Sequence, residues 1–187
     1  MHHGSPHQRS RRPHRGGFTL IEAAVATIIV GTGILGMVAA QQAWHRQNAW
    51  AERAAIGTRL GNEIREMTFN IVRHDPVTGA STWGPEPNEV TVLDYDDLDD
   101  FDGVAGNGLI LSDSLGNGPL NALREVIPGM EGWSQEVRVH NIDPTNVNLD
   151  LDDGTSDMMR VEVLVYWQGP LESAPVSITR VDWIAPN

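Results

Sequence analysis

Residues 11–40 read RRPHRGGFTLIEAAVATIIVGTGILGMVAA, and this stretch decides which architecture the rest of the chain can adopt. Arginines come first, then Glu22, and no further charged residue follows until Arg46. A helix of about 20 consecutive apolar residues is long enough to cross a bilayer. The stretch therefore predicts a transmembrane helix that follows a basic leader and carries one carboxylate near its start.

The remainder of the 187-residue chain is acidic. The whole chain has 25 acidic and 13 basic residues, a formal net charge of −12, and every basic residue is an arginine; four of the arginines lie before Gly16. Because an acidic surface repels phosphates, we expect no nucleic-acid partner. The sequence contains no cysteine, which excludes disulfides, thiolate metal sites and a thiol nucleophile.

The motif GFTLIE at residues 17–22, between the basic leader and the apolar run, resembles the class III signal of type IV pilins and type II secretion pseudopilins. The resemblance covers residues 9–40. It implies that a prepilin peptidase cuts between Gly17 and Phe18 and N-methylates Phe18. It further implies that Glu22 pairs with the freed terminal amine of a neighbouring pilin or pseudopilin subunit, so that cleavage permits assembly.

The cost of placing a charge in a membrane also favours a functional role for Glu22. Moving a charged side chain into the centre of a membrane helix costs about 2.5–3.5 kcal/mol on insertion scales, so such residues are usually paired. The alternative is a plain signal-anchor helix whose Glu22 lies near the membrane interface. Arginines before the apolar run favour a cytoplasmic N-terminus, a single pass through the inner membrane and a periplasmic or extracellular body.

A second motif competes with the membrane interpretation. GTGILG at residues 31–36 matches the G-x-G-x-x-G fingerprint of dinucleotide-binding folds. That fold also needs an acidic residue at the end of a second apolar strand, whereas the residues before Glu52 are polar and have a helical pattern. Glycines are also frequent in membrane helices, which is the simpler explanation.

The helical pattern continues beyond the membrane. Leu60, Ile64, Met67 and Ile71 recur on one helical face, and Pro76 should end the run. The chain is therefore expected to comprise a cleaved leader, the membrane or filament-core half of a helix, the amphipathic half of that helix, and a β-rich acidic head. The corresponding residues are 1–17, 18–43, 44–75 and 76–187.

The head should be mostly β-structure. Alternating apolar residues predict strands at residues 89–95, 135–142, 158–167 and 175–184, with a hairpin between the last two and a bulge after Ile178. Residues 77–88 have loop composition, and residues 104–133 are ambiguous. A long helix followed by a run of strands predicts an α+β fold of the pilin-like type, with an antiparallel sheet whose apolar face covers the helix.

Two stretches of the head are dense in aspartate, with spacings that do not fit an EF-hand. Dense carboxylates either form a solvated surface or bind a hard cation such as calcium, so calcium is a possible cofactor at either stretch. The candidate ligands in residues 94–103 are Asp94, Asp96, Asp97, Asp99, Asp100 and Asp102. Those in residues 146–157 are Asp150, Asp152, Asp153 and Asp157.

No catalytic constellation is visible, and the three histidines beyond the leader are far apart in sequence, so we expect no enzyme. The favoured hypothesis is a structural subunit, a minor pilin or pseudopilin, that is assembled into a type IV pilus or a type II secretion pseudopilus. The alternative is a membrane-anchored binding module whose acidic head captures a ligand or a secreted substrate. A DNA-binding competence pilin is disfavoured by the acidic head, and a signal-anchored enzyme by the lack of a site.

Overall fold

The computed structural model describes residues 17–185, so the predicted leader lies outside the described residues except for Gly17. The chain divides into two compact units, Met1–Asn48 and Ala49–Asn187. The helices and strands, in chain order, are α1 (Leu20–Thr68), η1 (Gly79–Ser81), η2 (Asp99–Asp102), η3 (Val104–Gly106), β1 (Leu109–Ser112), η4 (Asp113–Leu115), β2 (Trp133–Asp143), β3 (Asn146–Asp150), β4 (Met159–Trp167) and β5 (Val176–Ile184).

The first unit consists of the N-terminal part of α1, a helix of 49 residues in all. By length and composition α1 can cross a membrane, and its most apolar window is entirely exposed. Residues 31–36 lie inside this helix, and a Cβ added at any of their three glycines would meet open space. The dinucleotide alternative is therefore excluded, since it needs a turn between a strand and a helix at these residues.

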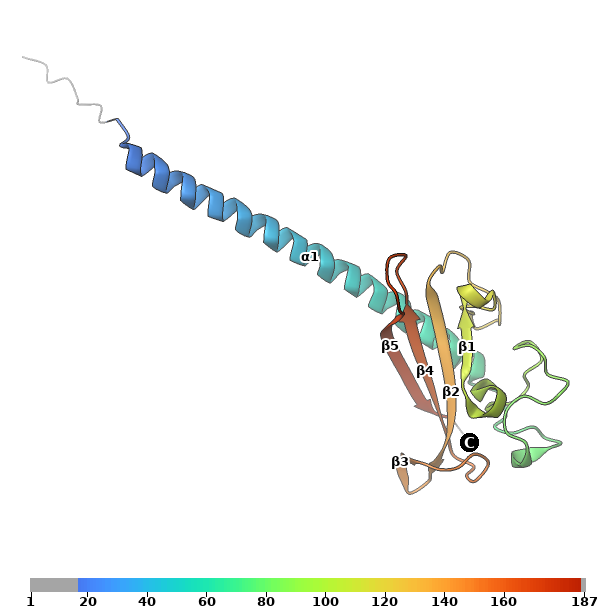
Figure 1. Cartoon of the computed structure of the whole chain (residues 1–187). Helices are drawn as coiled ribbons and strands as arrows, with labels where there is room; N and C mark the ends of the chain where they lie inside the picture. Colours follow the sequence, from blue (N-terminus) through green and yellow to red (C-terminus); the bar gives the residue numbers. More distant parts are fainter. Residues whose placement is uncertain (1–16, 186–187) are drawn as a thin grey trace, which may run out of the picture. The chain divides into compact units, whose positions relative to one another are not determined.

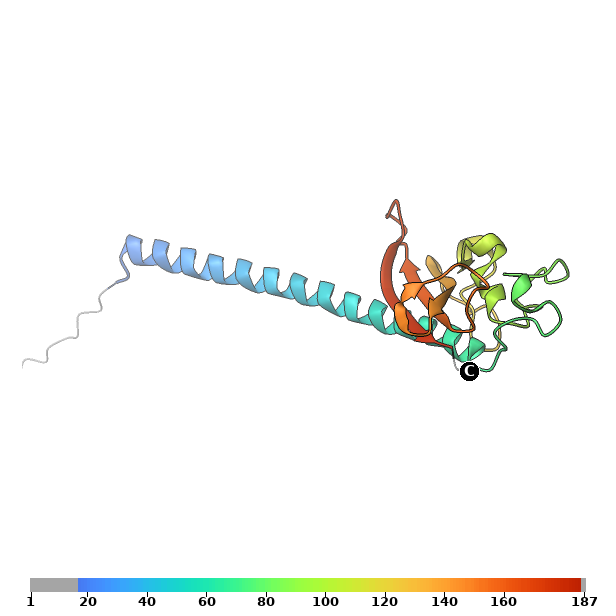
Figure 2. The same cartoon turned by 90° about the horizontal axis from the view of Figure 1, so that it is seen from below.

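The second unit contains a five-stranded antiparallel sheet in the order β1-β2-β4-β5, with β3 paired to β2 (Figure 1). The expected α+β layout, with one long apolar helix and an antiparallel sheet, is confirmed. Within this unit the end of α1 packs against one face of the sheet (Figure 2). The inward-facing residues Val137, Val139, Val161, Val163 and Val165 are completely buried.

The helix meets the sheet through small and apolar residues. Leu60 and Ile64 are fully buried in the same core as the sheet valines. A Cβ built on Gly61 would lie 2.6 Å from Cγ2 of Val181 in β5, so glycine is what permits this close approach. Gln135 is also buried here: its Nε2 donates to the carbonyls of Leu60 (2.8 Å) and Leu120 (3.1 Å), and its Oε1 accepts from the Leu120 N–H (2.8 Å). This single side chain links α1, β2 and the loop before β2.

The helix ends at Thr68, seven residues before the predicted boundary. The hydroxyl of Thr68 donates back to the Ile64 carbonyl (2.9 Å), and the chain then turns. Val72 forms an isolated parallel bridge with Asp97, and its carbonyl accepts from the Leu98 N–H (2.8 Å). The spacing of Ile71 from Met67 and Ile64 predicted further helical turns. Backbone pairing with the loop at Asp97 and Leu98 replaces them.

The strands predicted at residues 135–142, 158–167 and 175–184 correspond to β2, β4 and β5, and β4 and β5 form the expected hairpin. The pairing moves from Val165↔Thr179 to Tyr166↔Ser177, so the extra residue of the bulge is Ile178. Sequence analysis missed β1, a four-residue strand without alternation, and β3, which it assigned to an acidic loop.

The prediction of a strand at residues 89–95 is wrong. This segment forms turns in which the Thr91 N–H and hydroxyl both donate to the Asp94 carboxylate, at 2.9 Å each. Nη1 of Arg124 donates to the carbonyls of Val92 (2.9 Å) and Tyr95 (2.7 Å), which occupies acceptors that a neighbouring strand would use. Threonine and aspartate side chains compete in this way with a sheet ladder.

Candidate functional site

The first candidate site is the start of α1. The Thr19 N–H and hydroxyl donate to Oε2 of Glu22, at 2.8 and 3.0 Å, and the Glu22 N–H donates back to the Thr19 hydroxyl at 3.3 Å. This reciprocal pairing is a capping box, which satisfies backbone donors at a helix N-terminus. Glu22 therefore has a local structural role that sequence analysis missed, although the T-x-x-E spacing would have predicted it.

The bond between Gly17 and Phe18 lies just before this cap. Both residues are exposed and non-helical, and the Phe18 side chain is 87% exposed. A Cβ placed on Gly17 would meet no atom within 4 Å. Among the described residues, no side chain covers the Gly17–Phe18 bond. A protein that acts on this bond could therefore reach it.

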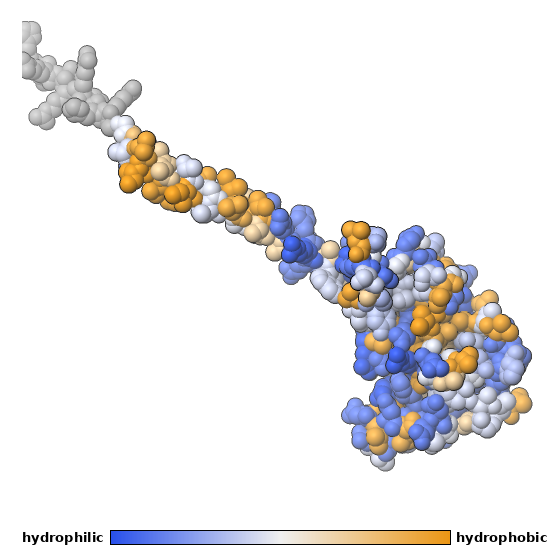
Figure 3. Space-filling model, in the orientation of Figure 1, coloured by the Kyte–Doolittle hydropathy of each residue, from blue (hydrophilic) through white to orange (hydrophobic). Residues whose placement is uncertain are grey.

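The N-terminal part of α1 is exposed and mostly apolar, and the face drawn in Figure 3 is mostly orange. Among its large side chains, Ile28, Ile29, Leu35 and Met37 are each more than 60% exposed. A helix that is apolar all round must be covered by protein or lipid to be stable. The apolar surface therefore requires a non-aqueous environment. The single carboxylate of Glu22 lies at the start of this surface.

The second candidate site is the first aspartate-rich stretch. Asp97, Asp99, Asp100 and Asp102 are buried, whereas Asp94 and Asp96 are exposed. The solvated-loop alternative therefore does not hold for the four buried residues. Burial away from solvent requires that each carboxylate find hydrogen-bond donors, a cation or a proton.

Two of the buried aspartates are fully used as structural acceptors. Asp99 accepts from the Gly84 N–H (3.0 Å), and its Oδ2 lies 2.6 Å from Nδ1 of His74. Asp102 accepts from Nε1 of Trp83 (3.0 Å) and from the Val139 N–H (2.9 Å). These contacts join the loop to the sheet and to the segment after α1.

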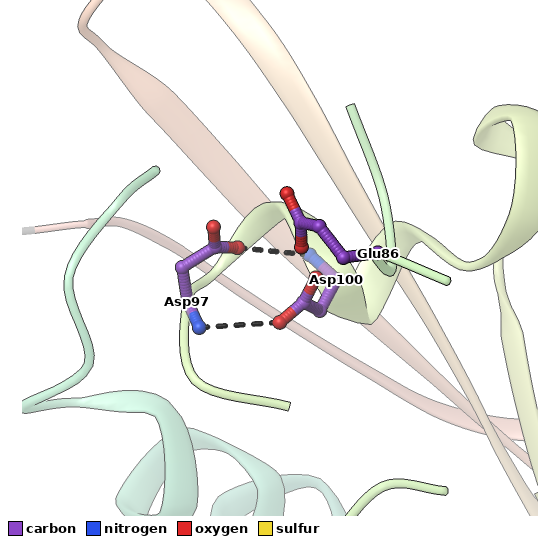
Figure 4. A group of neighbouring side chains, drawn as sticks. All are labelled: Glu86, Asp97 and Asp100. Carbon is purple, nitrogen blue, oxygen red and sulfur yellow. Dashed lines mark hydrogen bonds between the residues drawn. The ribbon is translucent and has the colours of Figure 1, made fainter. Parts of the chain in front are cut away.

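The other carboxylates gather into what we call the acidic cluster, consisting of Glu86, Glu89, Asp96, Asp97 and Asp100. Oxygen atoms of Glu86, Asp97 and Asp100 all lie within 4.8 Å of one another, and those of Glu89, Asp96 and Asp100 do so as well. Figure 4 shows the first group: Glu86 comes from the loop after η1 and meets the two aspartates at the start of η2. Asp100 belongs to both groups.

Burial changes the acidity of this region. Burial is the main cause that raises the pKa of Asp97 and Asp99 to about 7 and the pKa of Asp100 to about 6, and negative neighbours add to the effect. Burial likewise raises the pKa of Glu89 to about 7. Each shift reflects the free-energy cost of holding a negative charge away from water beside other negative charges.

Two oxygen atoms of the acidic cluster have no hydrogen-bond partner within the described part of the chain, although both are buried. They are Oδ1 of Asp100 and Oε2 of Glu86. The other oxygen of Asp100, Oδ2, accepts from the N–H groups of Asp96 (3.0 Å) and Asp97 (3.2 Å). Asp100 is completely buried and belongs to both groups of converging carboxylates, so its free Oδ1 has no access to water.

The second aspartate-rich stretch is arranged differently. Asp150, Asp152, Asp153 and Asp157 are all exposed, and in residues 17–185 they form no group of three converging ligand atoms. Asp150 lies at the end of β3 and pairs with Arg160. The carbonyl of Asp157 accepts from Arg73. The structure therefore brings the cation-ligand candidates together only in the first stretch.

The histidines occupy sites that their sequence positions did not predict. His74 follows α1 rather than lying on it, and it pairs with Asp99. Burial lowers the pKa of His74. His140 lies 3.9 Å from Glu162, while Arg138 pairs with Glu136.

Glu86 and Glu89 are the cluster members that sequence analysis missed. Glu86 lies in residues 77–88, which were assigned to a loop, and Glu89 is the first residue of the strand predicted at 89–95. The available signal was the presence of two carboxylates three residues apart, shortly before the aspartates. Only the turn that returns the chain at residues 91–94 brings them next to Asp100.

Comparisons with known proteins do not add a name to these sites. No family model matches the chain, and no curated protein or solved structure shows significant similarity to it. The functional argument therefore depends on the residues and the geometry described above.

Proposed function

We propose that this chain is a pilin-like structural subunit, a minor pilin or pseudopilin, which a prepilin peptidase processes and which then joins a type IV pilus or a type II secretion pseudopilus. The observation that carries the proposal is the GFTLIE motif at the start of α1, with Gly17 and Phe18 exposed immediately before the helix cap. Its function is assembly rather than turnover of a substrate.

The exposed apolar surface of α1 supports this proposal. In water that surface would be unfavourable, whereas the interior of the inner membrane and the core of a helical filament both provide apolar surroundings. The basic residues before the helix favour a cytoplasmic N-terminus, which puts the Gly17–Phe18 bond on the cytoplasmic side and the head in the periplasm or outside the cell.

Glu22 would then guide docking of one subunit on the next. Its capping bonds both reach Oε2, so within the described residues Oε1 remains available to a further donor. Cleavage after Gly17 converts the Phe18 nitrogen into a charged amine. A charge-assisted bond between that amine and a neighbour's Glu22 would satisfy both charges in an apolar filament core.

The first prediction concerns processing. When the full chain is made in a host with an active prepilin peptidase, mass spectrometry of the membrane fraction should find a mature terminus at N-methylated Phe18. Recovery of only the uncut leader would contradict the proposal.

The matched variant is Gly17→Val. Because a side chain at residue 17 would meet no neighbouring atom, this change should leave the folded protein intact and block only recognition by the peptidase. Unchanged cleavage of Gly17→Val would contradict the proposed site. Cleavage of the wild type without recovery in filaments would favour the binding-module alternative.

A further inference from the structure

Buried carboxylates that converge on one another repel unless protons or a bound cation neutralise their charge, because a few neutral hydrogen-bond donors do not. In the acidic cluster, Asp100 is completely buried and Asp97 is 1% exposed, yet both lie within 4.8 Å of Glu86 oxygens. Asp100 and Glu86, each of which has one buried oxygen without a hydrogen-bond partner among the described residues, belong to the same group of three (Figure 4). Leaving a buried acceptor unpaired is unfavourable, and more so when it is charged.

We propose that Glu86, Asp97 and Asp100 form a calcium-binding site in the head, with Glu89 and Asp96 close enough to complete its coordination. All five residues offer oxygen ligands, which hard divalent cations prefer. The site comes from two parts of an irregular segment, the turn at Glu86–Glu89 and the residues at the start of η2, and calcium tolerates irregular coordination better than magnesium does. This inference does not depend on the proposed role in filament assembly.

The geometry also indicates what the ion would stabilise. The segment from Glu86 to Asp100 contains no strand, and backbone turns and the Arg124 contacts hold it to the head. A cation shared by Glu86 and Asp100 would tie the first turn of this segment to η2. Because η2 contributes the buried Phe101 and the Asp102 bond to β2, the ion would fasten the whole loop to the sheet.

The test uses the full chain in detergent, freed of metal with a chelator and titrated with calcium chloride in a calorimeter. We expect one calcium per chain and a higher melting midpoint in calcium than in chelator. Magnesium chloride at the same concentration should bind more weakly. Absence of calcium binding, or equal binding of the two ions, would overturn the proposal.

Asp100→Asn is the decisive variant. The asparagine carbonyl can still accept from the N–H groups of Asp96 and Asp97, so the loop keeps its backbone contacts. Loss of the shared charged ligand should weaken calcium binding by about tenfold or more and should remove most of the calcium-dependent rise in the melting midpoint. In chelator, Asp100→Asn should melt at the same temperature as the wild type or higher, because one buried charge is gone.

Two control variants separate a ligand from a general effect of charge. Glu86→Gln removes a ligand from a different part of the loop and should weaken calcium binding in the same way. Asp152→Asn removes one charge from the exposed second stretch and should leave calcium binding unchanged. If Asp152→Asn weakened binding as much as Asp100→Asn, or if Asp100→Asn bound calcium normally, the assigned site would be wrong.

Discussion

Glu22 has one observed role, in the helix cap, and one proposed role, in assembly, and experiment can separate them. As the third residue of α1 it completes a capping box, and glutamine can serve in that position as well as glutamate. As the proposed partner of a neighbour's amine it must carry a negative charge. Glu22→Gln should therefore keep the helix start and the cleavage after Gly17 but fail to enter filaments.

The measurement for Glu22→Gln is the fraction of processed protein recovered in sheared filaments. Thr19→Val is the matched control, since it removes the capping hydroxyl and keeps the charge. Thr19→Val should lose about 0.5–2 kcal/mol of helix stability and still enter filaments. Normal entry of Glu22→Gln would contradict the charge pairing.

Gln135 is a polar residue in an otherwise apolar sheet face, and its three hydrogen bonds explain why it is buried. Gln135→Met keeps the length of the side chain but leaves the Leu120 N–H and carbonyl unsatisfied. Urea unfolding should show a loss of about 2–3 kcal/mol, since each buried group without a partner costs about 1–3 kcal/mol.

The control for this variant is Gln168→Met. Gln168 is exposed and its side chain makes one bond, to the Glu172 carbonyl (3.0 Å). Exposed substitutions of this kind usually change stability by less than about 0.5 kcal/mol. If the two variants were equally stable, Gln135 would not link the three elements as described.

At the scale of elements, the approach of α1 to β5 depends on Gly61. Gly61→Ala should gain about 1 kcal/mol of helix propensity but lose about 1–3 kcal/mol to overpacking, because Val181 is branched and cannot move far. We expect a net loss in urea unfolding. The double variant Gly61→Ala with Val181→Ala should recover part of that loss, and strictly additive effects would contradict the contact.

The elements that could be predicted from the sequence share a property. In β2 and β4 one face is buried, and in β5 one face is half-buried, so the apolar period of two is visible. Residues 89–95 show the same period, but Thr91 bonds to Asp94 within the segment, and Arg124, from a distant position, donates to the carbonyls of Val92 and Tyr95. A contact between residues so far apart leaves no local pattern in the sequence.

The two candidate sites also differ in how far the sequence alone predicts them. The start of α1 is encoded in consecutive residues, so the motif and its position could be predicted. The acidic cluster is assembled by turns, so composition indicated a carboxylate-rich loop but could not show that Asp99 and Asp102 serve as structural acceptors while Asp97 and Asp100 meet Glu86.

At the scale of the whole molecule, every residue of the hydrophobic core lies between Ile56 and Ala185. The fragment 49–187 should therefore fold without the apolar half of α1. Its melting midpoint should lie within about 4 °C of that of the full chain, the shift that about 1 kcal/mol produces in a domain of this size. Thermal melting followed by circular dichroism tests this, and a fragment without a cooperative transition would contradict it.

The contact between α1 and β5 also constrains the order of events during synthesis. Gly57 and Gly61 leave the ribosome early, whereas Thr179 and Val181, which lie against them, emerge only after the rest of the sheet. The apolar half of α1 is therefore complete while the surface that receives Gly57 and Gly61 is still missing. Closure of the core must wait for translation to reach β5, so a chain truncated by a premature stop codon before that strand would keep its apolar helix and expose an unfinished core to proteases.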